Sequence, residues 1–187
     1  MSSNIRGKKI GILATDGFEQ SELIDPRKAL DDAGATTEVI SLKDGEIKGW
    51  NSKDWGKSVK VDKTLDQAKP QDYDALLLPG GVMNPDHLRM EPKAVDFVRN
   101  FVATGKTIAA ICHGPWTLVE ADALKGKTVT SWPSIKTDLI NAGAKWVDQE
   151  VVTDGQLITS RKPADIPAFS RTLIESLSRN HADKNAA

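Results

Sequence analysis

Short apolar runs alternate with segments of helical periodicity along most of the chain. The runs that have the length of a buried parallel strand lie at residues 9–14, 36–42, 73–78 and 107–111. Apolar residues at helical spacing predict helices at residues 20–33, 92–104, 115–121, 134–142 and 165–177. Strand and helix in this alternation predict a three-layer, doubly wound α/β domain with a mostly parallel central sheet.

Two segments break the alternation. Residues 44–62 contain three glycines, two tryptophans and an alternating polar and apolar stretch, which indicates a β-hairpin. Asp154-Gly155 lies between the β-rich runs 146–153 and 156–159 and predicts a second hairpin. A turn of helix at 65–68 and a strand at 127–130 complete the expected elements.

The expected helix ends follow from local residue types. Gly34 and Gly143 each follow a helical segment and suit the left-handed position that ends a helix. Ser134 is expected to cap the helix 134–142 through its hydroxyl. Pro26 lies within the first predicted helix and either kinks or restarts it.

Three loops follow the carboxyl ends of predicted strands, where ligands bind in sheets of this kind. They are residues 15–19, residues 79–86 and the pair Cys112-His113. In the second loop, the backbone amides of Gly80 and Gly81 can approach a ligand because no side chain intervenes. We therefore expect the three loops to form one site.

Cys112 is the only cysteine and ends the apolar run 107–111, directly before His113, Gly114 and Pro115. A free cysteine is most often a small buried hydrophobe. Here, however, the sequence predicts a tight turn between a strand and a helix, and the amides and dipole of a helix N-terminus lower a thiol pKa. This position favours a reactive thiolate.

His113 is a candidate general base, or a cation that stabilises the thiolate. Adjacent residues on a sharp turn often point apart, so a packing or surface histidine is the alternative. A base in a triad also needs an orienting acceptor, for which Asp86 is the best candidate. Taken alone, Asp86 after Pro85 is better explained as a helix N-cap.

Glu19 follows the first strand and is expected near the same edge of the sheet. If burial beside the thiol raised its pKa, the protonated carboxyl could donate to the sulfur and act as an acid or base. An ordinary solvated residue in the first turn of a helix is the alternative.

Composition narrows the class of protein. The chain has 187 residues, of which 39% are hydrophobic and 27% are charged. This composition suits a single domain over residues 1–187, with a core at about 7–178 and a frayed tail at 179–187. A net charge of −1 disfavours a strong basic field, so no nucleic-acid partner is expected. No run is long enough to span a membrane, and the polar N-terminus is unlike a signal peptide. One cysteine cannot form an internal disulfide, so a cytoplasmic location is expected.

The residue set also argues against several kinds of site. The three histidines and the cysteine have no metal-site spacing, and phosphate-binding glycine motifs are missing, so we expect no metal and no cofactor. Acidic residues after the first strand would repel a flavin phosphate. The tryptophans are by default core or interface residues, although Trp116 and Trp132 are near enough to the site in sequence to wall its pocket.

The motifs Ala109-Ala110-Ile111-Cys112-His113-Gly114-Pro115, Leu78-Pro79-Gly80-Gly81 and Asp16-Gly17-Phe18-Glu19 together resemble the ThiJ/PfpI family, and its PfpI-type intracellular protease branch in particular. The resemblance covers roughly residues 7 to 178. It implies a flavodoxin-like α/β sandwich, Cys112 as nucleophile, Glu19 bonded to it, and His113 as the catalytic histidine.

The same resemblance implies a third triad member after the Gly-Gly loop, supplied by a neighbouring subunit. Asp86 matches that place, with aspartate where glutamate is expected, and a shared site implies a homo-oligomer, a dimer or a hexamer. The backbone amides of Gly81 and His113 would be the oxyanion donors.

Family members are described as cysteine peptidases, as glyoxalases or deglycases that act on methylglyoxal and its adducts, and as stress-protection or chaperone-like proteins. The resemblance thus implies a cysteine-dependent hydrolase or lyase linked to stress protection, with a small carbonyl or a peptide as substrate. A non-catalytic redox sensor or chaperone-like stress protein, in which Cys112 is oxidised, is the alternative. A glutamine amidotransferase has its nucleophilic cysteine at the same kind of strand-to-helix turn, called the elbow from here on (residues 111–115). It also needs a downstream His-x-Glu pair, which the sequence lacks.

Overall fold

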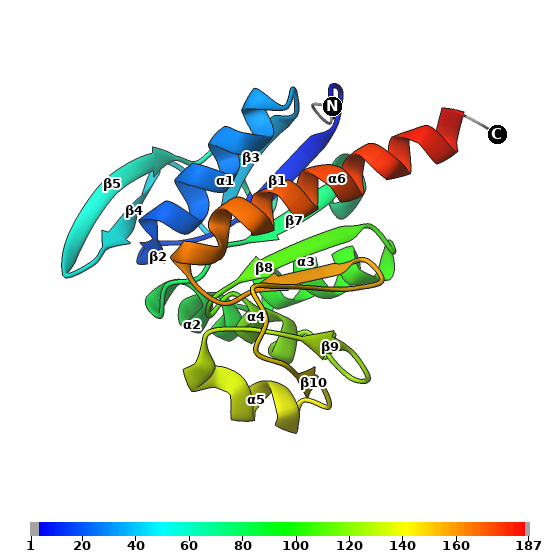
Figure 1. The fold of residues 1–187 in the computed structure, drawn as a ribbon. Helices are drawn as coiled ribbons and strands as arrows, with labels where there is room; N and C mark the ends of the chain where they lie inside the picture. Colours follow the sequence, from blue (N-terminus) through cyan, green and yellow to red (C-terminus); the bar gives the residue numbers. More distant parts are fainter. Residues whose placement is uncertain (1–3, 186–187) are drawn as a thin grey trace.

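The computed structural model describes residues 4–185, and side chains up to residue 179. A central sheet of seven strands in the order β11-β12-β8-β7-β1-β3-β6 forms the middle layer (Figure 1). Neighbouring strands are parallel except for β11, which runs antiparallel to β12. In sheet order the strands are Val151–Asp154, Leu157–Ser160, Thr107–Ile111, Ala75–Leu78, Lys9–Leu13, Thr36–Ser41 and Lys63–Thr64.

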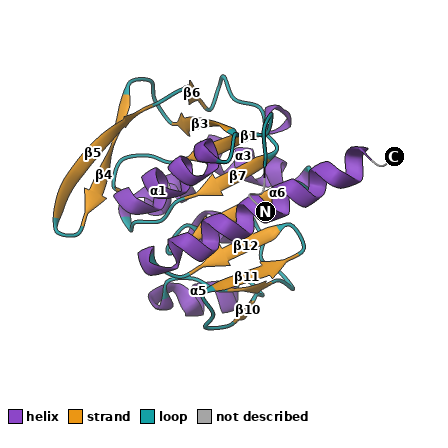
Figure 2. Ribbon diagram, turned by 45° about the horizontal axis from the view of Figure 1, so that its top comes forward, coloured by secondary structure: helices purple, strands orange, loops and turns teal. Residues whose placement is uncertain are grey.

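Helices cover both faces of the sheet (Figure 2). Helices α1 (Gln20–Asp32) and α6 (Ile166–Asn185) pack on one apolar cluster, which includes Leu23, Leu30 and Phe169. The opposite cluster lies under α2, α3, α4 and α5, which span Met83–Met90, Pro92–Ala103, Pro115–Glu120 and Lys136–Asn141. The predicted three-layer α/β fold with a mostly parallel sheet is confirmed.

The first hairpin forms a second, smaller sheet that projects from the body of the molecule (Figure 1). Strands β4 (Glu46–Asn51) and β5 (Asp54–Lys60) pair antiparallel, and β2 (Phe18–Glu19) adds to β4 in parallel. The hairpin is tied to the loop after β1, because the amide of Gly17 donates to the carbonyl of Lys48 at 2.8 Å. It therefore stands beside the carboxyl edge of the main sheet.

Several predicted elements differ from the observed ones. Helix α2 was not predicted, because it starts only two residues after the Gly-Gly loop and contains Pro85. Near the expected turn of helix at 65–68, residues 65–67 form a turn in which the amides of Gln67 and Ala68 donate to the carbonyl of Thr64, and a short 3₁₀ helix, Pro70–Asp72, follows. The strand expected at 127–130 is β9 (Thr128–Val129), which pairs with β10 (Lys145–Trp146) in a separate two-stranded sheet.

The last two helices also differ from expectation. Helix α6 continues to Asn185, so helical backbone extends through most of the tail that was expected to be frayed, and residues 186–187 lie outside the described part. Ser134 does not cap α5: it lies in a 3₁₀ turn, Pro133–Ile135, and the cap position of α5 is Ile135. The Ser134 hydroxyl is therefore available for another partner.

Between residues 4 and 185, no helix has both the length and the apolar character needed to cross a membrane.

Candidate active site

Cys112 lies at a sharp turn between β8 and α4, as the sequence predicts. Its backbone is left-handed, with φ of 62°, a strained conformation for any residue with a Cβ atom. Two backbone hydrogen bonds hold the turn: the Cys112 amide donates to Ser160, and its carbonyl accepts from Trp132, both at 3.0 Å. The strained backbone is thus held by β12 and by the loop that contains Trp132, and Cys112 as a whole is 6% exposed.

The three predicted loops do converge on the thiol. A methyl group built on Gly80 would lie 2.5 Å from Glu22 Oε2, 2.7 Å from Cys112 Cβ and 2.9 Å from the backbone nitrogen of His113. The loop after β7 therefore touches both the first helix and the elbow. This close approach explains why the position has no side chain.

We expect Gly80→Ala to destabilise the protein by roughly 1–3 kcal/mol, because the three neighbours cannot all move away from the added methyl group. Urea unfolding measures the change. A stability equal to that of the unchanged protein would show that the loop is looser than these distances indicate.

Glu22 is the carboxyl group that contacts the thiol, and the prediction that Glu19 makes this contact was wrong. Glu22 is fully buried, its Oε2 accepts the Gly80 amide at 2.8 Å, and its carboxyl group lies close enough to Cys112 for each to shift the pKa of the other. Glu19 belongs to β2 and is half-buried; its Oε1 accepts from the Ser21 hydroxyl at 3.4 Å. One helical turn further along α1, Glu22 points inward with the buried face of the helix.

Burial raises the pKa of Glu22 to about 8, and the bonds to Cys112 and Gly80 only partly oppose this rise. The carboxyl group is therefore largely protonated near neutral pH. Its Oε1 is buried and accepts no hydrogen bond from the residues that the structure describes. A proton on the carboxyl group gives Glu22 the means to donate a hydrogen bond to the sulfur.

Burial also raises the pKa of the Cys112 thiol, and negative charge on Glu22 raises it further. The sequence predicted a lowered thiol pKa. The observed pKa shift is upward, because burial raises the thiol pKa by more than the nearby backbone N–H groups lower it. The backbone N–H groups of His113 and Gly81, which lie near the sulfur, partly lower the thiol pKa. Protonation of Glu22 removes the opposing charge, so the thiolate forms most easily while Glu22 holds its proton.

His113 contacts the sulfur despite being the next residue in the chain. Its Nδ1 lies 3.3 Å from Cys112 Sγ, and its Nε2 lies 3.3 Å from Ser134 Oγ. The imidazole stacks on Trp132, with ring centroids 6.0 Å apart, and meets Trp116 edge-on at 5.2 Å. Burial lowers the pKa of His113, so the ring is neutral at pH 7 and able to accept a proton.

Asp86 is not the acceptor that orients His113 within one chain. It lies inside α2 with its side chain exposed, instead of capping a helix. Among the described residues, the two nitrogens of His113 face Cys112 and Ser134. The Asp86 carboxylate is therefore directed to the surface of the chain, away from the imidazole of His113.

A pocket of about 260 Å³ opens above the thiol. The predicted residues Glu19, Gly81, His113 and Trp132 line it, and Gly80 and Trp116 lie behind them against Cys112 and His113. The sequence did not single out five other lining residues: Glu22, Trp50, Ser52, Val82 and Pro163. Two of these come from the projecting hairpin, whose position no local pattern reveals.

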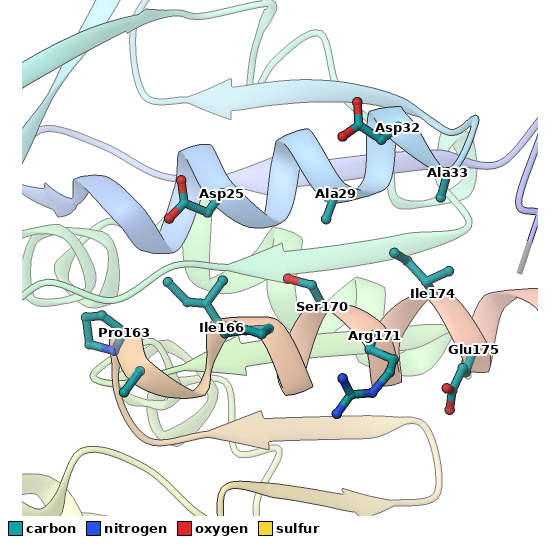
Figure 3. A pocket seen from close by; sticks show the side chains of 12 residues that line it. Asp25, Ala29, Asp32, Ala33, Pro163, Ile166, Ser170, Arg171, Ile174 and Glu175 are labelled. Carbon is teal, nitrogen blue, oxygen red and sulfur yellow. The ribbon is translucent and has the colours of Figure 1, made fainter. Parts of the chain in front are cut away.

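A larger groove of about 780 Å³ lies elsewhere, between α1 and α6 (Figure 3). Charged residues from both helices, including Asp25 and Asp32 on α1 and Arg171 and Glu175 on α6, lie along it. Neither the thiol nor the imidazole reaches this groove, so the smaller pocket is the candidate active site.

The chain as a whole is similar to known proteins. The DJ-1/PfpI family matches residues 8–176. A deglycase of Pyrococcus horikoshii is 44% identical over 169 residues, which cover 90% of this chain and 99% of that protein. The Escherichia coli protein named protein/nucleic acid deglycase 2 is 46% identical over 171 residues, with 91% and 98% covered. The crystal structure of Drosophila melanogaster DJ-1beta superposes with a TM-score of 0.82 at 33% identity, covering 91% of this chain and 90% of that one.

Proposed function

This chain belongs to the DJ-1/PfpI family, and we propose that it is an enzyme whose Cys112 thiolate attacks small electrophilic carbonyl groups, with methylglyoxal and its adducts as substrates. The observation that carries the proposal is the set of groups around one sulfur: a buried carboxyl group, a neutral imidazole and two backbone amides. This set can supply a nucleophile, a base and a donor to a developing oxyanion.

In the proposed first step, His113 Nδ1 takes the proton of the Cys112 thiol, and the sulfur attacks the aldehyde carbon. The electron pair of the C=O bond moves to its oxygen, which accepts hydrogen bonds from the amides of Gly81 and His113. A proton then converts this oxygen to the hydroxyl of a hemithioacetal. The buried position of the thiol, at 6% exposure, keeps water from competing for the same carbon.

In the second step, a base removes the proton from the carbon that carries sulfur, and a proton is returned to the adjacent carbonyl carbon. The hydroxyl proton of the hemithioacetal is lost and the oxygen of the former ketone gains one, so the proton count is unchanged. This internal transfer oxidises one carbon and reduces the other, giving a lactoyl thioester. Water hydrolyses the thioester and regenerates the free thiol of Cys112, so that overall methylglyoxal and water give lactate. Glu22, in contact with the sulfur, and His113 are the groups placed to carry these protons.

The size of the pocket favours a small adduct over a polypeptide. About 260 Å³ is at the low end of the volumes that hold small molecules. Relatives of similar length bear deglycase names, which supports the same substrate class. The link to stress protection follows from this chemistry, because reactive dicarbonyls damage proteins.

The assay that tests the proposal compares two substrate classes. We expect the purified protein to form lactate from methylglyoxal, or to release free thiol from a glycated N-acetylcysteine, faster than it cleaves an unstructured peptide. Measurable peptide cleavage with no lactate would replace the proposed activity by a peptidase. If the protein shows neither of these two activities, the result favours the redox-sensing alternative, in which mild peroxide adds two oxygens to Cys112.

We further propose that the protein is a homo-oligomer in which Asp86 of one subunit serves the site of another. The exposed position of Asp86 on α2 supports this arrangement. We expect Asp86→Asn to lose most activity, about 10- to 100-fold. Mixing this variant with Cys112→Ser after reversible dissociation should restore part of the activity, because mixed assemblies contain sites with an intact thiol and an intact carboxylate.

The matched control for this experiment is Asp96→Asn, an exposed acid on α3 that pairs with Arg99. It should leave activity unchanged. If the mixed assemblies stay as inactive as the two variants alone, Asp86 does not act between subunits.

A further inference from the structure

The imidazole of His113 has a hydroxyl group as its second partner. Ser134 Oγ lies 3.3 Å from Nε2, on the side of the ring away from the sulfur. The two neighbouring tryptophans do not compete for this nitrogen, because the Trp116 indole N–H donates to Asp138 and the Trp132 ring stacks on the imidazole face. Ser134 is therefore the side chain placed to decide where the proton of the neutral ring lies.

A neutral imidazole has one N–H, on Nδ1 or on Nε2. His113 can take the thiol proton only if Nδ1 is bare, because Nδ1 is the nitrogen that faces Cys112 Sγ at 3.3 Å. A hydroxyl oxygen that accepts from Nε2–H favours this tautomer. The same hydrogen bond persists after Nδ1 is protonated, since the imidazolium keeps its Nε2–H.

We propose that Ser134 is a positioning residue that holds the proton of neutral His113 on Nε2 and leaves Nδ1 free to accept the proton of Cys112. The inference rests on the proposed function only for its consequence in catalysis. The tautomer itself is a property of the resting protein.

The backbone fixes Ser134 relative to the elbow. The amide of Trp132 donates to the carbonyl of Cys112 at 3.0 Å, and the amide of Ile135 donates to the carbonyl of Trp132 at 3.2 Å. Ile135 is buried, so it anchors the 3₁₀ turn that carries the serine. Ser134 and Trp132 thus belong to one short segment. This segment places the hydroxyl beside the imidazole and the Trp132 ring in the lining of the pocket.

This arrangement also accommodates the proposed role of Asp86. An acid that arrives from a neighbouring subunit cannot reach Nδ1, because the sulfur occupies that side of the ring. The Ser134 hydroxyl accepts from Nε2–H and keeps its own O–H to donate. It can therefore connect the imidazole to a carboxylate outside the chain.

The direct test is nitrogen-15 NMR of the His113 ring at a pH above its pKa. The variant His87→Gln/His181→Gln leaves one histidine in the chain and makes the signals unambiguous. We expect one nitrogen with the shift of an N–H group, identified as Nε2 by its couplings to both ring protons. In Ser134→Ala the two nitrogen shifts should move towards each other, because both tautomers become populated, and Ser134→Thr should restore the original pattern.

In the protein that keeps all three histidines, the turnover of the Ser134 variants should follow the same order as the NMR result. We expect Ser134→Ala to lower kcat about 10-fold with little change in KM, and Ser134→Thr to regain most of the loss. Thr137→Ala, which removes an exposed hydroxyl from α5, is the control and should behave as the unchanged protein.

A His113 ring that carries its proton on Nδ1, or a tautomer unaltered in Ser134→Ala, would overturn the proposal. The NMR result does not depend on turnover, so the two proposals can fail separately. If the tautomer responds to Ser134 while no carbonyl substrate is converted, the positioning role stands and the proposed function fails.

Discussion

Replacing Cys112 with serine is expected to lower the turnover of methylglyoxal by roughly a thousand-fold or more. A serine hydroxyl is a much weaker acid than a thiol, and the buried site offers it no strong base: the pKa of His113 is lowered by burial. Lactate production at saturating substrate measures the effect. Near-complete retention of activity would remove the nucleophile from the mechanism.

The fold should survive this substitution, because serine is close to cysteine in size and the elbow is held by backbone bonds to Ser160 and Trp132. An unchanged melting temperature would separate loss of chemistry from loss of structure. Since Cys112 is the only cysteine, loss of iodoacetamide labelling in the variant provides a second control.

Glu22→Gln is expected to remove most of the pH dependence of stability between about pH 4.5 and pH 8. The pKa of Glu22 is raised from 4.5 to about 8, so in this range the folded protein keeps a proton that the unfolded chain has lost. The free energy of unfolding therefore falls as the pH rises through this window and levels off beyond it. For one group the fall is on the order of 5 kcal/mol.

Glutamine reproduces the shape of the protonated acid: its oxygen can accept from the Gly80 amide and its NH₂ can donate to the sulfur. At pH 5 we therefore expect the variant to be slightly less stable than the unchanged protein. At pH 8 we expect it to be more stable. Urea unfolding at several pH values measures this. Glu19→Gln is the matched control and should keep most of the original slope; an equal slope in Glu22→Gln would mean that Glu22 is already ionised in the folded protein.

The elbow was predictable from sequence because its signal is local. An apolar run, a cysteine and a glycine-proline pair follow one another without a break, and the strand and the helix that they predict form as β8 and α4. The Gly80-Gly81 turn was predictable for the same reason. These segments meet because parallel strands place their carboxyl ends at one edge, which is a rule of topology that needs no side-chain detail.

The identity of the acid was not predictable, because two glutamates lie three residues apart at the start of one helix. The choice between them depends on where the helix begins. Phe18 and Glu19 pair with the projecting hairpin as β2, so Glu19 stays at the pocket rim and the first turn of α1 carries Glu22 inward. Only the long-range pairing of residues 18–19 with 49–50 settles this point.

The contact between His113 and Ser134 could not be predicted from the sequence, because it too depends on a long-range backbone contact. A serine after a proline and before a helical run predicts a cap, and the sequence contains nothing that directs its hydroxyl elsewhere. The segment 132–134 is instead drawn to the elbow by the bond from the Trp132 amide to the Cys112 carbonyl. The hairpin residues Trp50 and Ser52 reach the pocket in the same way, through tertiary contacts.

The decisive measurement is carbon-13 NMR of the protein mixed with an equal amount of methylglyoxal labelled at the aldehyde carbon. We expect a transient signal of a tetrahedral carbon bonded to sulfur and oxygen. This signal should disappear as the carboxyl signal of lactate grows, and it should not form with Cys112→Ser. Lactate that forms at an unchanged rate in Cys112→Ser, without that signal, would contradict the claim that Cys112 is the nucleophile.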